Sequence, residues 1–125
     1  MNYSRFEDLP VWKEAINLAS MVDDFIRSLS KGVLSFTQKD QLERASLSVS
    51  NNIAEGFERR TTKELIAFIF IAKGSAGEVR SLLLFLESRP YLIHLKTQIV
   101  QIKSVAESCS KQLGAWASHL RQSTI

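Results

Sequence analysis

The chain has 125 residues, 45% of them hydrophobic and 23% charged, which suits one globular domain with its own core and excludes a disordered chain. Five glycines and two prolines are too few for a turn-rich all-β fold, and a single cysteine, Cys109, excludes an intramolecular disulfide and a cysteine-based zinc site. The net charge of +3 is unevenly divided. Residues 1–58 carry six basic and nine acidic side chains, whereas residues 59–125 carry ten and four, a net +6.

The sequence carries no sign of export or membrane insertion. The N-terminus lacks the basic-then-apolar order of a signal peptide. The longest apolar run, residues 65–72, is far shorter than the roughly 20 residues that span a bilayer. We therefore expect a cytoplasmic protein without membrane contact.

Apolar residues recur at steps of three and four along most of the chain, which predicts four helices. Their expected bounds are approximately residues 8–31, 37–58, 61–88 and 91–121. For the first helix, Asp8 is the candidate N-cap, Pro10 falls in the first turn and Gly32 is the candidate stop. Its predicted core row is Trp12, Ala15, Ala19, Val22, Ile26, Leu29 and Val33.

The remaining helices have similar start signals. Thr37 with Asp40 resembles a capping box at the second helix, Thr61 with Glu64 forms a clearer one at the third, and Pro90 ends the third helix. The predicted core rows are Leu42, Ala45, Val49, Asn52 and Gly56, widened by Ile53 and Phe57; Leu65, Phe68, Ala72, Ser75, Val79, Leu82 and Leu86; and Leu92, Leu95, Ile99, Ile102, Ala106, Cys109, Leu113, Trp116 and Leu120. Short connections make neighbours antiparallel, so the predicted fold is all-α, an antiparallel up-down-up-down four-helix bundle.

The third helix has more apolar surface than one core stripe needs. Residues 65–72 and 82–86 are apolar on every side of the helix, and an exposed patch of that kind usually marks an interface. This favours a homo-oligomer, although the helix would also read this way if it were central and covered by its own chain's loops. The candidate interface residues are Ile66, Ile69, Phe70, Gly74 and Gly77.

The second helix places polar residues where a core is expected. Asn52 shares the row of Leu42 and Val49, and a buried polar group without a partner costs about 1–3 kcal/mol. We expect a structural polar network or interface made of Arg44, Asn52, Glu55, Lys73 and Glu78. Two alternatives are a ligand or nucleic-acid contact site and a catalytic site.

Catalysis has little support in the residue pattern. Di-metal bundles require Glu-x-x-His pairs, and none occurs here; His94 and His119 are isolated. There is no phosphate-binding glycine loop and no nucleophile motif. We expect no catalytic residue, metal, cofactor or small-molecule substrate, and an enzyme using Glu55 and Glu78 would need a metal or a bound ligand.

Basic residues form two groups. Arg89, Lys96 and Lys103 are seven residues apart, and Lys111 continues close to the same line on the fourth helix. Arg59, Arg60 and Lys63 cluster where the third helix begins. Such rows bind phosphate backbones without reading sequence, and copies of them in an oligomer add to one field. The alternative is an ordinary solvated helix face.

The chain resembles a bacterial family of four-helix-bundle proteins whose founding members are encoded in intervening sequences of large-subunit ribosomal RNA genes. The resemblance is carried by residues 6–15 (FEDLPVWKEA), 44–56 (RASLSVSNNIAEG) and 63–68 (KELIAF), the last followed by residues 72–75 (AKGS) and Glu78. Where this chain has Ser50 the family typically has proline, so a straighter second helix is expected here.

The resemblance implies a ring-shaped homo-oligomer, with pentamers the expected form, and no enzymatic activity. Nucleic-acid binding is suspected for the family, in part because relatives are accessory subunits of reverse transcriptases in diversity-generating retroelements. The leading hypothesis is therefore a non-catalytic oligomer that binds RNA or DNA through pooled basic surface. The alternative is a protein-interaction or adaptor module that binds no nucleic acid.

Overall fold

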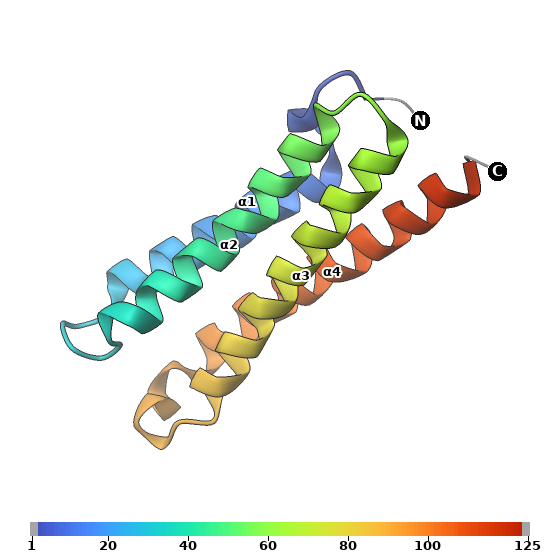
Figure 1. Ribbon diagram of the computed structural model, residues 1–125. Coiled ribbons are helices and arrows are strands. Elements are labelled where there is room, and N and C mark those ends of the chain that lie inside the picture. The colour runs from blue at the N-terminus through green and yellow to red at the C-terminus, as the bar shows by residue number, and fades with distance from the viewer. Residues whose placement is uncertain (1–2, 124–125) are drawn as a thin grey trace.

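The computed structural model describes residues 3–123 and confirms the predicted helical bundle (Figure 1). Four long helices, α1 (Pro10–Ser28), α2 (Phe36–Phe57), α3 (Thr62–Glu87) and α4 (Lys96–Ser123), run alternately up and down. Two short 3₁₀ helices, η1 (Phe6–Asp8) and η2 (Pro90–Leu95), precede α1 and α4. Within the described part of the chain, no helix is both long enough and apolar enough to cross a membrane.

The helices pack around a square. α1 contacts α2 and α4, and α3 contacts the same two helices, so α1 and α3 lie diagonally opposite each other. Figure 1 shows the α1–α2 pair and the α3–α4 pair diverging toward the end that holds the connections 29–35 and 88–95. The opposite end of the bundle gathers η1, the α2–α3 turn and the end of α4.

Helix starts agree only in part with the sequence signals. The Thr61 hydroxyl accepts a hydrogen bond from the Glu64 N–H (3.1 Å), as predicted. The capping box of α2 lies two residues earlier than expected, because Ser35 accepts from the Gln38 N–H and the Gln38 side chain accepts from the Ser35 N–H. Asp8 lies within η1 and does not cap α1.

α1 begins directly at Pro10, which is tolerated there because a first-turn N–H has no helical acceptor. α1 then ends at Ser28, before the candidate stop. Gly32 lies in the following turn, where its φ of +88° is one that side-chain-bearing residues rarely adopt.

The core rows of α1 and α3 agree only in part with the predicted ones: Ala15 and Val22 of α1 and Ala72, Val79 and Leu86 of α3 are buried as predicted, whereas the other predicted residues are half-buried. The buried residues of α1 are Val11, Ala15, Leu18, Val22 and Phe25, and those of α3 are Ile69, Ala72, Ala76, Val79, Leu83 and Leu86. Both helices carry two adjacent apolar rows, so periodicity alone does not select the buried one. The predicted row of the fourth helix is bordered by polar residues, and most of it is buried. The buried members are Leu92 in η2 and Ile99, Ile102, Ala106, Cys109 and Leu113 in α4.

α2 and α3 approach each other closely along their shared side. A Cβ atom added to Gly56 would lie 2.6 Å from the Cβ of Phe68, so only glycine fits without displacing α3. Two turns earlier, the hydroxyls of Ser48 and Ser75 are 2.8 Å apart. α2 continues unbroken through Ser50, the position where proline would remove a helical hydrogen bond.

Candidate oligomer and nucleic-acid interfaces

The outer side of α3 exposes large apolar side chains. Phe70, Ile71, Leu84 and Phe85 are each about half exposed, between 41% and 51%. At about 1.5 Å per residue, the distance from the first to the last is roughly 22 Å along the helix. We call the surface made by these four residues and Gly74 the α3 face. The alternative, in which loops of the same chain cover the helix, does not hold at these positions.

The structure corrects the candidate interface set at one position. Ile69 is fully buried and belongs to the core, because the buried row of α3 passes through it. Ile66 is half-buried and Phe70 is exposed. At Gly74 and Gly77 an added Cβ would meet nothing within 4 Å, so neither glycine is required by a contact within the subunit.

Two exposed phenylalanines on the α3 face have an arginine above the ring. The Arg121 guanidinium lies 4.8 Å from the ring centroid of Phe70, and that of Arg89 lies 5.0 Å from the ring centroid of Phe85. Such contacts contribute about 0.5–1 kcal/mol at exposed sites. The apolar surface therefore has a cation at each end.

The predicted polar network does not form. Arg44 pairs with Asp40 (3.0 Å), Arg59 pairs with Glu55 (3.0 Å), and Asn52 donates to the Ser48 carbonyl (2.7 Å). The rest of the predicted row of α2 is buried: Leu42, Ala45, Val49 and Gly56, with Ile53. Asn52 is only half-buried, because the row widens on its other side, through Ser46 and Ser50. The polar link between α2 and α3 is instead made by the two serines, Ser48 and Ser75, with the Asn52 side chain donating to Ser48 (2.9 Å).

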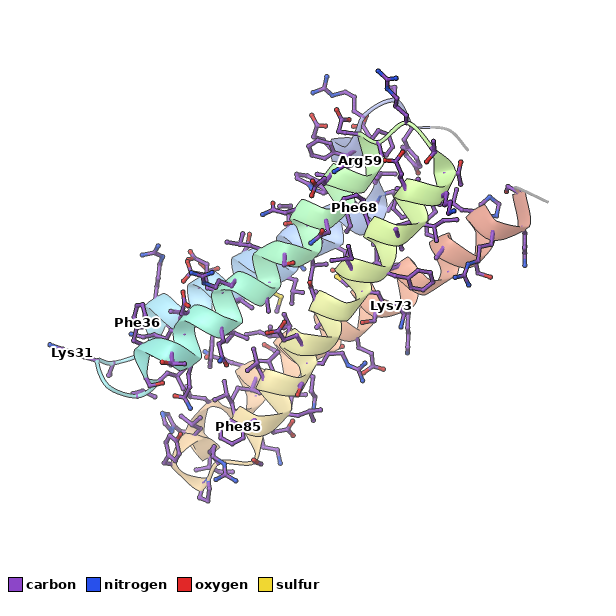
Figure 2. All side chains as sticks on the ribbon, in the orientation of Figure 1. Lys31, Phe36, Arg59, Phe68, Lys73 and Phe85 are labelled. Carbon is purple, nitrogen blue, oxygen red and sulfur yellow. The ribbon has the colours of Figure 1, made fainter. Side chains whose placement is uncertain are left out.

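Lys73 and Glu78 lie apart from that link. The end of the Lys73 side chain passes over Gly114 of α4, where an added Cβ would lie 3.3 Å from its Cε (Figure 2 shows Lys73 at mid-height). Glu78 is exposed. The contact between Ser48 and Ser75 places Glu78 level with about residue 45, so Glu55 is about 15 Å further along the bundle axis. The paired carboxylates of glycoside hydrolases stand about 5–9.5 Å apart, and Glu55 and Glu78 are farther apart than that.

Basic side chains gather at the end of the bundle that holds the α2–α3 turn. Arg59 is committed to its own subunit, since it pairs with Glu55, lies 3.9 Å from Glu64 and stacks over Phe68 at 4.7 Å (Figure 2). Arg60 and Lys63 are exposed and form no ion pair within residues 3–123. A hollow of about 420 Å³ brings Lys63 and Thr62 together with Ile66 and with Arg121 from the last turn of α4.

The predicted stripe on α4 is partly neutralised. Lys103 forms an ion pair with Glu87 of α3, with both side chains about 80% buried, and Lys111 pairs with Glu107 at 3.3 Å. Arg89 lies in the connection before η2, against Phe85. Lys96 is exposed at the start of α4. The seven predicted basic residues therefore form two separate groups near opposite ends of the bundle. Lys103 and Lys111 lie between these groups, and both already form ion pairs.

A groove between α1 and α2 carries the opposite charge. It has a volume of about 330 Å³, and its lining includes Asp23, Asp24 and Glu43 beside the partly exposed Ile16 and Leu47. We call these five residues the acidic groove. Asp23 pairs with Arg27, whereas Asp24 and Glu43 form no ion pair in the described part of the chain. Sequence reasoning missed it, although the net charge of −3 over residues 1–58 was a signal.

The fold is a four-helix bundle with three distinctive surfaces: the apolar α3 face, the acidic groove, and a basic end formed by Arg60 and Lys63 beside Arg121. The chain belongs to the 23S rRNA-intervening sequence protein family, whose sequence profile matches residues 7–115. This confirms the resemblance inferred from its three sequence blocks.

A solved structure has the same fold. It is a protein of unknown function from the S23 ribosomal protein family of Bacteroides thetaiotaomicron VPI-5482, determined at 1.70 Å resolution. It superposes with a TM-score of 0.78 at 20% identity, covering 86% of this chain and 97% of the other. Among curated protein sequences, none matches this chain.

Proposed function

We propose that this chain is a non-catalytic subunit of a homo-oligomer, with a pentameric ring as the expected form, and that the oligomer binds RNA or DNA through basic residues at one end of the bundle. The observation that carries the proposal is the pair of exposed cations, Arg60 and Lys63, beside Arg121 at the α2–α3 turn. Unpaired cations release condensed counterions when they meet phosphates, which favours binding without base recognition.

The paired lysines of α4 contribute less to this surface than their spacing suggests. Lys103 would have to leave Glu87, and Lys111 would have to leave Glu107, before either could meet a phosphate. Lys96 is exposed and supplies a secondary contact at the other end. Binding therefore depends chiefly on the end that holds Arg60 and Lys63.

The test is fluorescence anisotropy with a labelled single-stranded RNA of about 20 nucleotides across a salt series. Arg60→Glu with Lys63→Glu is compared with a charge-matched control, Lys31→Glu with Lys39→Glu, in the α1–α2 turn and the first turn of α2 at the opposite end of the bundle. The first variant is expected to lower affinity at least about tenfold. It should also reduce the slope of log K against log salt by about 1.4, the value for two phosphate contacts on a single strand. The control should retain wild-type affinity and slope.

Equal losses in both variants would mean that only net charge matters, and the assignment to this end would be wrong. No binding of RNA or duplex DNA at low salt would instead favour the alternative function, a protein-interaction module. The observation that supports this alternative is the half-exposed apolar α3 face, which is a surface suited to protein contacts.

A further inference from the structure

The α3 face and the acidic groove lie on different sides of the bundle, because α3 is diagonally opposite α1. Both surfaces expose apolar side chains: Phe70, Ile71, Leu84 and Phe85 on the face, Ile16 and Leu47 in the groove. The face is a ridge along one helix, whereas the other surface is a groove between two helices. Their shapes are therefore of the kind that interlock.

The charges around the α3 face are mainly positive. Arg121 and Arg89 lie over its two phenylalanine rings. Lys73 passes over Gly114 of α4, and Arg80, nearly two turns further along α3, lies on the same side of the helix. Glu78 is an acidic residue on the exposed side of the helix. Arg80 forms no ion pair in the described residues, and its Nε is buried without a hydrogen-bond acceptor. The side of α3 next to α4 thus carries basic charge that its own subunit does not neutralise.

The glycines of α3 also indicate an approaching partner. A glycine in the interior of a helix costs about 0.5–1 kcal/mol relative to alanine. Neither Gly74 nor Gly77 has a neighbour within 4 Å of an added Cβ, so the subunit alone gives no steric reason for them. Gly74 lies between the two apolar pairs of the α3 face, where it lowers the ridge and would let another helix come close.

We propose that the occupant of the α3 face is the acidic groove of a second copy of this chain, in a head-to-tail contact. This inference rests on the proposed homo-oligomer and specifies which surfaces form it. Asp24 and Glu43, which have no ion pair within the described subunit, would face Lys73 and Arg80 of the neighbour, while Leu47 and Ile16 would pack against its apolar ridge. Charge complementarity fixes the choice of occupant.

The same charges argue against a two-fold dimer through α3. A two-fold contact places the same patch on both subunits, so the cations of one α3 face would meet those of the other. A head-to-tail contact leaves one groove and one face open at the ends of every pair. Repetition of the contact forms a ring when the rotation between neighbouring subunits divides a full turn, as the proposed pentamer requires.

Two variants with opposite defects test the contact. The face variant is Ile71→Glu with Phe85→Glu, and the groove variant is Ile16→Glu with Leu47→Glu; all four sites are at least about one-third exposed, so folding should be retained. Each variant alone is expected to have the mass of a single 14.1 kDa chain by light scattering. Mixed one to one, they should form a heterodimer of twice that mass, since each supplies the surface that the other lacks.

The control is Phe36→Glu with Ile93→Glu, two highly exposed apolar residues outside both surfaces, which should assemble as the wild type does. The proposal is wrong if the groove variant still assembles, or if the mixture stays monomeric while both variants keep wild-type circular dichroism. If either glutamate variant unfolds, the same positions are changed to serine and judged by the same outcomes. A monomeric wild type would overturn the homo-oligomer itself, whereas a wild-type oligomer formed by the groove variant would overturn only this contact.

Discussion

Gly56→Ala tests the close approach of α2 and α3. The added Cβ would lie 2.6 Å from the Cβ of Phe68, 3.3 Å from a Leu65 methyl and 3.4 Å from the Leu65 carbonyl oxygen. Ordinary carbon–carbon contact is about 3.5–4.0 Å, so α3 must move by about 1 Å. The Phe68 Cβ is fixed to the α3 backbone and moves only with it.

The magnitude follows from two opposing effects. Overpacking of this kind costs about 1–3 kcal/mol, and replacing a helical glycine by alanine returns about 1 kcal/mol. We expect a net destabilisation of about 1–2 kcal/mol. With an m-value of about 2 kcal/mol per molar urea, the midpoint of unfolding should fall by about 0.5–1 M.

The assay is urea unfolding followed by circular dichroism, carried out in the face variant, which is expected to be monomeric, so that subunit exchange does not enter the free energy. Gly77→Ala is the matched control, because Gly77 lies on α3 with nothing within 4 Å of an added Cβ. This variant should raise the free energy of unfolding by about 0.5–1 kcal/mol. A Gly56→Ala protein as stable as the Gly77→Ala protein would refute the close packing of α2 on α3.

Two further predictions concern buried positions. Desolvation, with a smaller contribution from Glu14, raises the pKa of Cys109 to about 12 from an ordinary value of about 9. Between about pH 9 and pH 12 the thiol ionises in the unfolded chain while it stays protonated in the folded one. The free energy of unfolding should therefore fall by about 1.4 kcal/mol per pH unit relative to that of Cys109→Ala. Parallel pH profiles of the two proteins would contradict this. Ser50→Pro removes a helical hydrogen bond and should lower the free energy of unfolding, measured in urea, by about 3 kcal/mol. Ser50→Ala loses only the hydrogen bond from the Ser50 hydroxyl to the Leu47 carbonyl and should lower it by less than about 1.5 kcal/mol. Similar losses in both variants would show that α2 already bends at this position.

The helices were predictable because periodicity and capping act locally. Thr61 caps α3 as its sequence suggests, and the row of α4 from Ile99 to Leu113 is buried as predicted. The buried rows of α1 and α3 were predictable only in part, because two adjacent apolar rows compete and only packing against the other helices decides between them. Val11 and Leu18 are therefore core residues, while Trp12 and Ala19 lie at its margin.

The candidate polar sites divide in the same way. Pairs four residues apart on one helix, such as Arg44 with Asp40 and Lys111 with Glu107, could have been recognised in the sequence, and they would have shown that those cations have partners. The ion pair between Lys103 and Glu87 joins different helices. This pair depends on the register of α3 against α4, and the spacing of residues within either helix does not determine that register.

The basic end and the α3 face are linked by the symmetry of the proposed assembly. In a ring closed by one repeated head-to-tail contact, every subunit points the same way along the ring axis. Arg60 and Lys63 lie at an end of the bundle, beyond the stretch of α3 that would be covered. Each added subunit therefore places another copy of these cations on the same rim, and their fields add there. Two unpaired cations would make a weak phosphate site in one subunit, whereas the same pair repeated around a rim would make a strong one, so the proposed assembly and the proposed binding would both follow from one arrangement.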